Sequence, residues 1–167
     1  KERLVQLKTE KNNSDEWGEF IINGDGKVEW RFDTSKQFIT DFPITNKDSN
    51  RDGCWVIYEK PKKDSDGGIP WGRYLSSLDP IDKGEEETNS GNEHSLASCF
   101  IMDAFTRTIV AEYTGRPGVA EDYYEQLWRG VEFYSSTMLY ENNLKGVYTY
   151  FKNKNKIHLL ADEPTSL

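Results

Sequence analysis

Leu75-Ser-Ser-Leu-Asp79-Pro80 is a short apolar segment that ends in a carboxylate, Asp79, followed by a proline. A second such segment ends in Glu141 followed by two asparagines: Thr137-Met-Leu-Tyr-Glu141-Asn142-Asn143. A strand that stops at an acid, and then at Pro or Asn, places that carboxylate at the rim of a sheet. Acids that meet at one rim can share a hard divalent cation. The alternative is that either acid only terminates its strand, because acids and Asn are common turn residues.

The residues between these segments predict how the two strands are connected. The pattern indicates a buried strand at Arg73–Leu78 and further strands at Ser95–Met102, Thr108–Tyr113 and Thr137–Tyr140. It also indicates a helix at Ala120–Tyr134, where apolar residues recur at helical spacing. The second and third strands read as a hairpin. The predicted order is therefore strand, strand, strand, helix, strand.

This order constrains where the two acids lie. A crossover through the helix lets the last strand run parallel to the first, and such crossovers are right-handed. If the two strands are neighbours, Asp79 and Glu141 emerge at the same rim. The central part of the chain is thus predicted to be an α/β domain with a mixed sheet.

The N-terminal part has a different pattern, which predicts β structure. Trp17–Phe42 reads as a hairpin around the turn Gly24-Asp25-Gly26, and Cys54–Tyr58 reads as a further strand. The segment Lys60–Gly68, with a Pro and a double Gly, is the best boundary in the chain. We therefore expect a linker and β-rich extension over 1–68 and a second domain over 69–167.

Length and composition limit the class of protein. With 167 residues, 35% of them hydrophobic and 13% aromatic, the chain can form one domain, or a compact domain with an extension, around a packed core. It has no run of about 18 apolar residues and no signal peptide, so we expect no membrane contact and an intracellular setting. Because it begins at Lys1 without Met, we expect an internal fragment of a longer protein.

Cysteine and histidine do not predict a metal site. Cys54 and Cys99 lie in apolar, β-like runs, where a free cysteine behaves as a small core residue, although a disulfide stays an alternative. His94 and His158 are far apart and have no Cys or His neighbour at ligand spacing.

Charge argues against a protein that only grips nucleic acid. The net charge is −8, and it is concentrated after residue 78, where 15 acids face 8 bases. The segment 142–161, however, contains no acid. We expect its lysines to contact phosphates, and the alternative is a solvated lysine-rich face; they are Lys145, Lys152, Lys154 and Lys156.

Paired carboxylates without His or Cys favour Mg²⁺ or Mn²⁺. Two such ions, roughly 3.5–4 Å apart, can support phosphodiester hydrolysis. We assign the bridging role to Asp79 and the flanking role to Glu141. A glycosidase pair is the competing chemistry, but no aromatic platform is evident beside either acid. Weaker additional metal candidates are Asp82, Glu93 and Asp103.

A second motif competes for a cation. Asp48 to Glu59 fits D-x-[DN]-x-[DN]-G-x₅-E, the pattern of an EF-hand calcium loop. An EF-hand needs a helix on each side, whereas Pro43 precedes this segment and Trp55 to Tyr58 is β-like. A polar turn is the preferred interpretation, and a β-rich binding or docking module with a calcium loop is the alternative function.

Three segments together resemble the nuclease domain of the large terminases of tailed bacteriophages, over roughly residues 71–167. The most specific is Leu139-Tyr-Glu-Asn-Asn-Leu-Lys-Gly146, which follows a strand. The others are Tyr74-Leu-Ser-Ser-Leu-Asp79-Pro80 and Thr108-Ile-Val-Ala-Glu-Tyr-Thr-Gly-Arg-Pro117.

The resemblance implies an RNase H-like mixed sheet with a flanking helix, and a metal-dependent endonuclease that cuts concatemeric double-stranded viral DNA during packaging. Asp79 matches the first catalytic acid and Glu141 the second. Glu93 stands near a position where the family has another acid. The third catalytic Asp falls after further strands, and neither Asp162 nor Glu163 matches it, so we expect it beyond residue 167.

The same resemblance implies the setting. It places the protein in the host cell cytoplasm, at the portal of the procapsid, with an upstream ATPase motor domain and the small terminase as partners. It assigns no role to the N-terminal β segment, which we interpret as an insertion or as a docking surface toward the motor domain or the portal.

Overall fold

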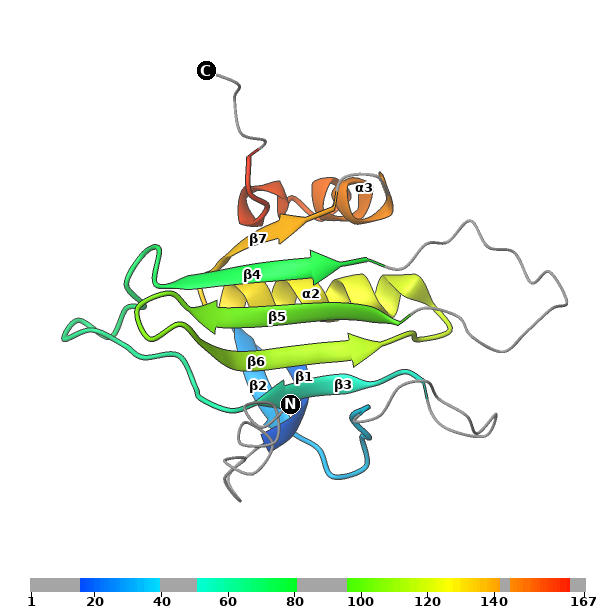
Figure 1. Ribbon diagram of the computed structural model, residues 1–167, viewed down its shortest axis with the longest axis horizontal. Helices are drawn as coiled ribbons and strands as arrows, with labels where there is room; N and C mark the ends of the chain where they lie inside the picture. The colour runs from blue at the N-terminus through cyan, green and yellow to red at the C-terminus, as the bar shows by residue number, and fades with distance from the viewer. Residues whose placement is uncertain (1–15, 40–50, 81–95, 142–144, 163–167) are drawn as a thin grey trace, which may run out of the picture.

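The computed structural model describes residues 16–39, 51–80, 96–141 and 145–162, which form an α/β structure built on one seven-stranded mixed sheet. Figure 1 shows the strands side by side, with α2 crossing behind them. In chain order the elements are β1 (Glu16–Ile22), β2 (Val28–Phe32), β3 (Cys54–Ile57), β4 (Tyr74–Asp79), β5 (Ala97–Asp103), β6 (Thr108–Gly115), α2 (Ala120–Phe133), β7 (Thr137–Tyr140), α3 (Lys145–Asn153) and the 3₁₀ helix η1 (Ile157–Leu159).

The predicted order of elements is confirmed between β4 and β7. The strands of the sheet lie in the order β2-β1-β3-β6-β5-β4-β7, with β5 and β6 antiparallel and β7 parallel to its neighbour β4. The observed bounds of these strands and of α2 lie within two residues of the predicted ones. The crossover from β6 through α2 therefore places β7 beside β4, the first strand of this unit.

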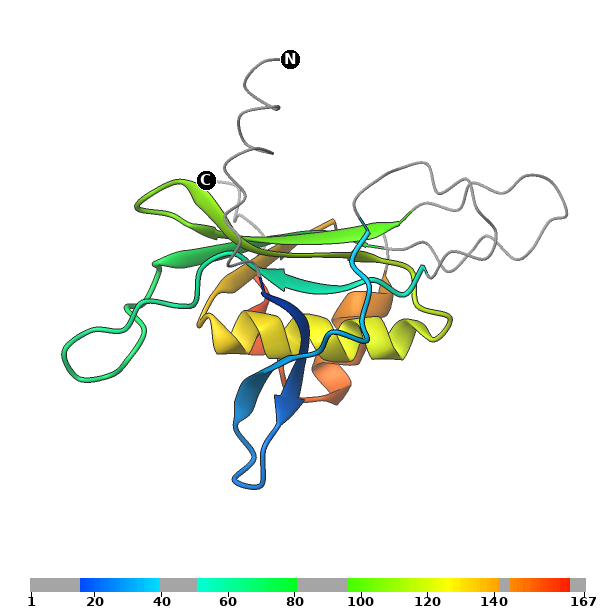
Figure 2. The same ribbon diagram turned by 90° about the horizontal axis from the view of Figure 1, so that it is seen from below.

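The helices cover only one face of this sheet. Figure 2 shows α2 and α3 on the same side of the strands. We predicted β4 to be a buried strand, but Tyr74, Ser76 and Leu78 are buried whereas Leu75, Ser77 and Asp79 are exposed. β4 is therefore buried on one face only, because successive side chains of a strand point to opposite faces. The prediction was wrong for the other face. We call the face that carries Leu75, Ser77 and Asp79 the open face.

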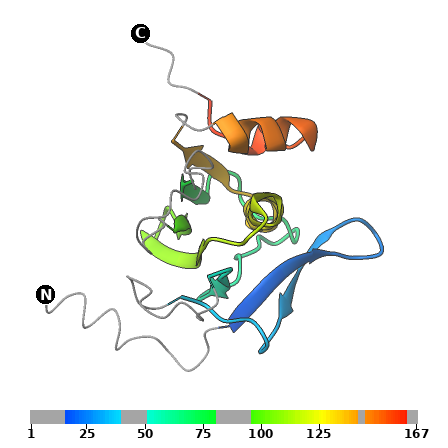
Figure 3. The same cartoon turned by 90° about the vertical axis from the view of Figure 1, so that its right-hand side faces the viewer.

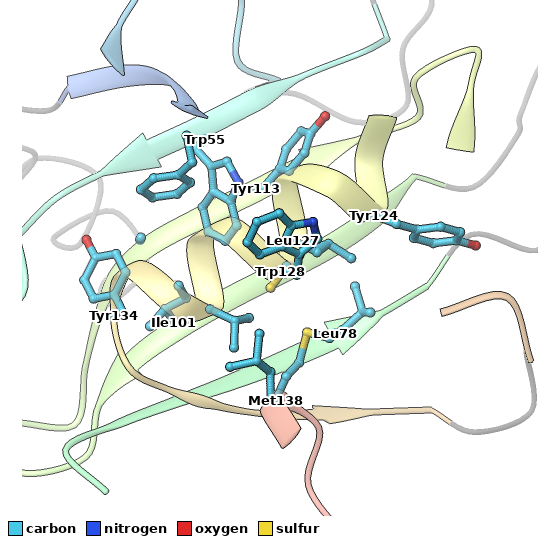
Figure 4. Close-up of a cluster of buried hydrophobic side chains, with 14 of the residues drawn as sticks. Trp55, Leu78, Ile101, Tyr113, Tyr124, Leu127, Trp128, Tyr134 and Met138 are labelled. Carbon is cyan, nitrogen blue, oxygen red and sulfur yellow. The ribbon is translucent and has the colours of Figure 1, made fainter. Parts of the chain in front are cut away.

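The core lies between the sheet and α2. The helical spacing predicted from the sequence is confirmed, because Tyr124, Leu127, Val131 and Tyr134 are all buried. Figure 4 shows aromatic and aliphatic side chains gathered between the helix and the strands, among them Leu127, Trp128 and Tyr134. Within the described residues, no helix is long and apolar enough to cross a membrane.

The N-terminal strands belong to the same sheet. β3 pairs with β6 and β1 pairs with β3, so the sheet is continuous across the predicted boundary at residue 68. The β1–β2 hairpin turns away beside α2 (Figure 3), where Gln126 accepts from the Phe20 amide at 2.9 Å and donates to the Phe20 carbonyl at 3.0 Å. One side chain thus satisfies both backbone groups of a strand residue that has left the plane of the sheet.

Candidate functional site

The sheet brings the two predicted acids together. In the parallel pairing of β4 with β7, Leu78 is opposite Tyr140, so the next residues on each strand are Asp79 and Glu141. Paired positions on neighbouring strands are about 4.8 Å apart and point to the same face. Both acids are exposed, and the alternation of buried and exposed residues along β4 and β7 places them on the open face. The prediction that they meet at one end of the sheet is confirmed by this register.

We call this end of the sheet the rim: β4, β6 and β7 end there, and β3 and β5 begin there. A polar row extends along it from the acids. Asp79 is opposite Ser98, Ser98 is opposite Thr114, and Thr114 is opposite Cys54. The hydroxyls of Ser98 and Thr114 are hydrogen-bonded at 3.1 Å. Sequence patterns did not predict this row, because it depends on the register of four strands.

A tyrosine lies beneath the rim, in the first turn of α2. Tyr123 is fully buried, and its hydroxyl has no hydrogen-bond partner among the described residues. Burial, and then the neighbouring Cys99, Tyr113 and Asp79, raise its pKa well above the ordinary tyrosine value. The phenol therefore stays neutral, and an unpartnered buried hydroxyl with Asp79 among its neighbours can still bond to a water or a ligand.

The described donors fit a hard cation but do not complete its coordination. Two carboxylates suit Mg²⁺ or Mn²⁺, which prefer oxygen ligands. The part of the chain that the structure describes holds no group of three His, Cys, Asp or Glu side chains that could bind a metal. The weaker candidates Asp82 and Glu93 lie outside the described residues. Any further ligands of a bound ion would therefore have to be groups other than the described His, Cys, Asp and Glu side chains.

The third weak candidate, Asp103, does not belong to this site. It is opposite Tyr74, at the end of the sheet away from Asp79, because β5 runs antiparallel to β4. Its buried carboxylate accepts from the Arg73 guanidinium at 2.8 Å and from the Phe105 and Thr106 amides. Burial opposes its ionisation, but these bonds outweigh burial and lower the pKa of Asp103. Asp103 holds the β5–β6 turn to the start of β4.

Two of the four predicted phosphate-binding lysines form ion pairs with acids of α2. Lys154 lies 3.3 Å from the Glu125 carboxylate, and Lys156 forms an ion pair with Glu132 and lies 4.3 Å from the centre of the Trp128 ring. Both lysines thus neutralise acids of α2, which sequence proximity could not reveal. Lys152 is exposed on α3, which runs away from the rim. Lys145 begins α3 close to Glu141 in the chain, and its side chain lies outside the described part.

The described part of the calcium-loop pattern, residues 51–59, does not form a calcium loop, and Asp48 and Asn50 lie outside the described residues. Its segment Cys54–Ile57 is β3, which pairs with β1 on one side and β6 on the other. A strand therefore separates Asp52 from Glu59, and four extended residues span about 13 Å. One ion cannot be ligated by both acids at about 2.4 Å, as an EF-hand requires.

Fold and rim together define an α/β protein whose mixed sheet presents two neighbouring carboxylates on an open face. Comparison of the chain with protein-family models, with curated proteins and with solved structures gives no match.

Proposed function

We propose that this chain is part of the nuclease domain of a large terminase, with an RNase H-like sheet that cleaves concatemeric double-stranded viral DNA with the help of divalent metal ions. The observation that carries the proposal is the parallel register of β4 and β7, which makes Asp79 and Glu141 neighbours on the open face. The resemblance of the sequence around these two acids to terminase nucleases supports the same assignment.

Asp79 is the residue best suited to bridge two ions. β4 has a neighbouring strand on each side, so groups from β5 and from β7 can both approach Asp79. Glu141 follows β7, the edge strand, which has a neighbouring strand on one side only. The ions, Mg²⁺ or Mn²⁺, would activate water and stabilise the leaving oxygen of the phosphodiester. The protein's own part is to hold the two carboxylates in register and to leave the face beside them open to a long substrate.

The test is nicking of supercoiled plasmid DNA in the presence of Mn²⁺ or Mg²⁺. Because the resemblance implies a further acid beyond residue 167, the assay uses this chain and a longer protein that contains it. We expect metal-dependent nicking that falls at least about 100-fold with Asp79→Asn or Glu141→Gln, the scale of losing one preorganised charged group at the reacting centre.

Asp66→Asn is the matched control, because Asp66 is exposed in the loop before β4 and far from the rim. It should leave nicking unchanged. Metal-dependent cleavage that survives both rim substitutions would contradict the assignment, and so would the absence of cleavage by the longer protein.

A non-catalytic docking module is the second candidate, and one observation favours it. Large apolar side chains are exposed on the open face, with Phe100 at 38% and Leu139 at 57%. Ser77 lies between them in the register of β5, β4 and β7. A docking module predicts that Phe100→Lys or Leu139→Lys abolishes binding of a protein partner while Asp79→Asn does not affect it.

A further inference from the structure

The rim continues past the polar row to a segment of the N-terminal part. Residues 51–53 precede β3 and lie against the end of β6, where the Arg116 amide donates to the Arg51 carbonyl at 2.6 Å. The Tyr113 hydroxyl donates to the Asp52 carbonyl at 2.9 Å. Two arginines from distant parts of the sequence are thereby held on neighbouring backbones.

Two glycines make this approach possible. A Cβ on Gly53 would lie 2.0 Å from the Thr114 carbonyl oxygen, and a Cβ on Gly115 would lie 2.2 Å from the Asp52 carbonyl oxygen. Gly53 also has a φ of 66°, which disfavours other residues. The two backbones therefore meet with no side chain between them, and the positions of Arg51 and Arg116 are determined by a rigid contact.

These arginines are distinguished by their place on the sheet. Both are half-buried at the rim: Arg116 directly follows β6, which carries Thr114, and Arg51 precedes β3, the next strand of the sheet. With strands about 4.8 Å apart, the distance from Asp79 is about 10 Å to β6 and about 14 Å to β3. The other described arginines lie on β2, before β4, in the β5–β6 turn and on α2: Arg31, Arg73, Arg107 and Arg129.

We propose that Arg51 and Arg116, with the Ser98 and Thr114 hydroxyls, form a phosphate-binding track that leads to Asp79 and Glu141. This rests on the proposed function, and it names the part of the substrate that the site grips, the sugar–phosphate backbone of a DNA strand. Arginine guanidinium groups and hydroxyls commonly donate hydrogen bonds to phosphate oxygens. A track of about 14 Å spans about four nucleotides at 3.4 Å of rise each. The N-terminal strands thereby acquire a role, because β3 brings Arg51 to the rim.

The track also shows how a chain of net charge −8 can hold DNA. Its cations stand at one end of the polar row, and the acids at the other end would be neutralised by bound ions. Lys154 and Lys156, which follow α3 and pair with acids of α2, are not needed for this grip. Binding should therefore depend on divalent ions and on the rim arginines.

The test measures binding of this chain to a short DNA duplex by fluorescence anisotropy, with Ca²⁺ present, over a range of salt concentrations. For a contact to one phosphate, the slope of log affinity against log salt changes by about 0.9. We expect Arg51→Ala and Arg116→Ala each to reduce the slope by about that amount and the double substitution by about twice that. Arg116→Lys should keep most of the slope, because the charge remains.

Arg107→Ala is the control, since Arg107 is exposed at the opposite end of the sheet, and thermal unfolding of each variant verifies that it is folded. Unchanged slopes in both rim variants, with DNA cleavage still abolished by Asp79→Asn, would overturn the track and leave the nuclease assignment intact. If no salt-dependent DNA binding and no cleavage are seen, the proposed function fails and the track with it.

Discussion

At the residue scale, hydrogen bonds decide the ionisation of partly buried acids in this protein. Glu125 on α2 accepts from the Tyr150 hydroxyl at 2.6 Å and from the Arg129 guanidinium at 2.8 Å, and Lys154 lies nearby. Burial alone would raise its pKa, but these interactions outweigh burial and lower the pKa of Glu125 to about 2. One carboxylate thus ties α3 to α2.

We predict that Glu125→Gln lowers the free energy of unfolding by about 1–3 kcal/mol at neutral pH, since hydrogen bonds to a charged group are lost. The folded pKa of about 2 lies below the value of 4.5 for a free glutamate. The stabilisation is therefore complete above about pH 4.5 and lost as pH falls toward 2. Urea unfolding at pH 7 and at pH 3 measures both values.

Glu29→Gln on the exposed strand β2 is the control, and it should change the unfolding free energy little at either pH. If Glu125→Gln lowers the free energy of unfolding by the same amount at pH 7 and at pH 3, this account is contradicted.

At the scale of elements, α2 and β3 meet at a glycine. Trp55 is fully buried and its indole nitrogen donates to the Gln126 carbonyl at 3.2 Å. A Cβ on Gly130 would lie 2.5 Å from Cζ2 of that indole, a distance that real Cβ contacts essentially never show. Gly130 is therefore retained inside a helix because only hydrogen leaves room for the tryptophan, despite the low helix propensity of glycine.

We predict that Gly130→Ala lowers the free energy of unfolding by about 1–3 kcal/mol, because overpacking exceeds the gain in helix propensity. Near-ultraviolet circular dichroism should show a changed tryptophan environment. Gly24→Ala is the matched control, since a Cβ on Gly24 meets no atom within 4 Å. If the Gly130→Ala variant is as stable as the wild type, α2 and β3 can move apart without lowering the free energy of unfolding.

At the scale of the whole molecule, the continuous sheet joins the N-terminal strands to the rest. Cys54 on β3 and Cys99 on β5 are both free and buried, which confirms the prediction that they are core residues. Burial raises the pKa of the Cys54 thiol to about 11 and that of Cys99 to about 12. Because the thiolate is the reactive form, both cysteines should be inert while the protein is folded.

We predict that both cysteines become reactive toward an alkylating reagent at the same denaturant concentration, because β3 and β5 flank β6 in one sheet. Mass spectrometry of labelled peptides measures each site separately. Labelling of Cys54 at a lower denaturant concentration than Cys99 would show that residues 1–68 unfold on their own, as a separate domain would.

Local patterns were sufficient for the elements around the acid pair. Helical spacing located α2, and apolar runs bounded by turn residues located β4 and β7. A crossover through the helix then let the last strand run parallel to the first, and the right-handed rule restricted the choices. The same reasoning failed for Asp103, because an acid after a strand looks alike at either end of a sheet. It could not show that Lys154 and Lys156 pair with acids that lie 24 to 29 residues away in the chain.

The sequence by itself determined the order of strands and helices and the two carboxylates that follow apolar strands, since these depend on interactions among residues close in the chain. That the two strands are neighbours was decided by the tertiary structure. Only the tertiary structure decided that β3 pairs with β6, that a polar row links Asp79 to Arg116, and that one face of the sheet is open. Pairing between distant strands depends on how both pack against the same helix, and no local pattern records that packing.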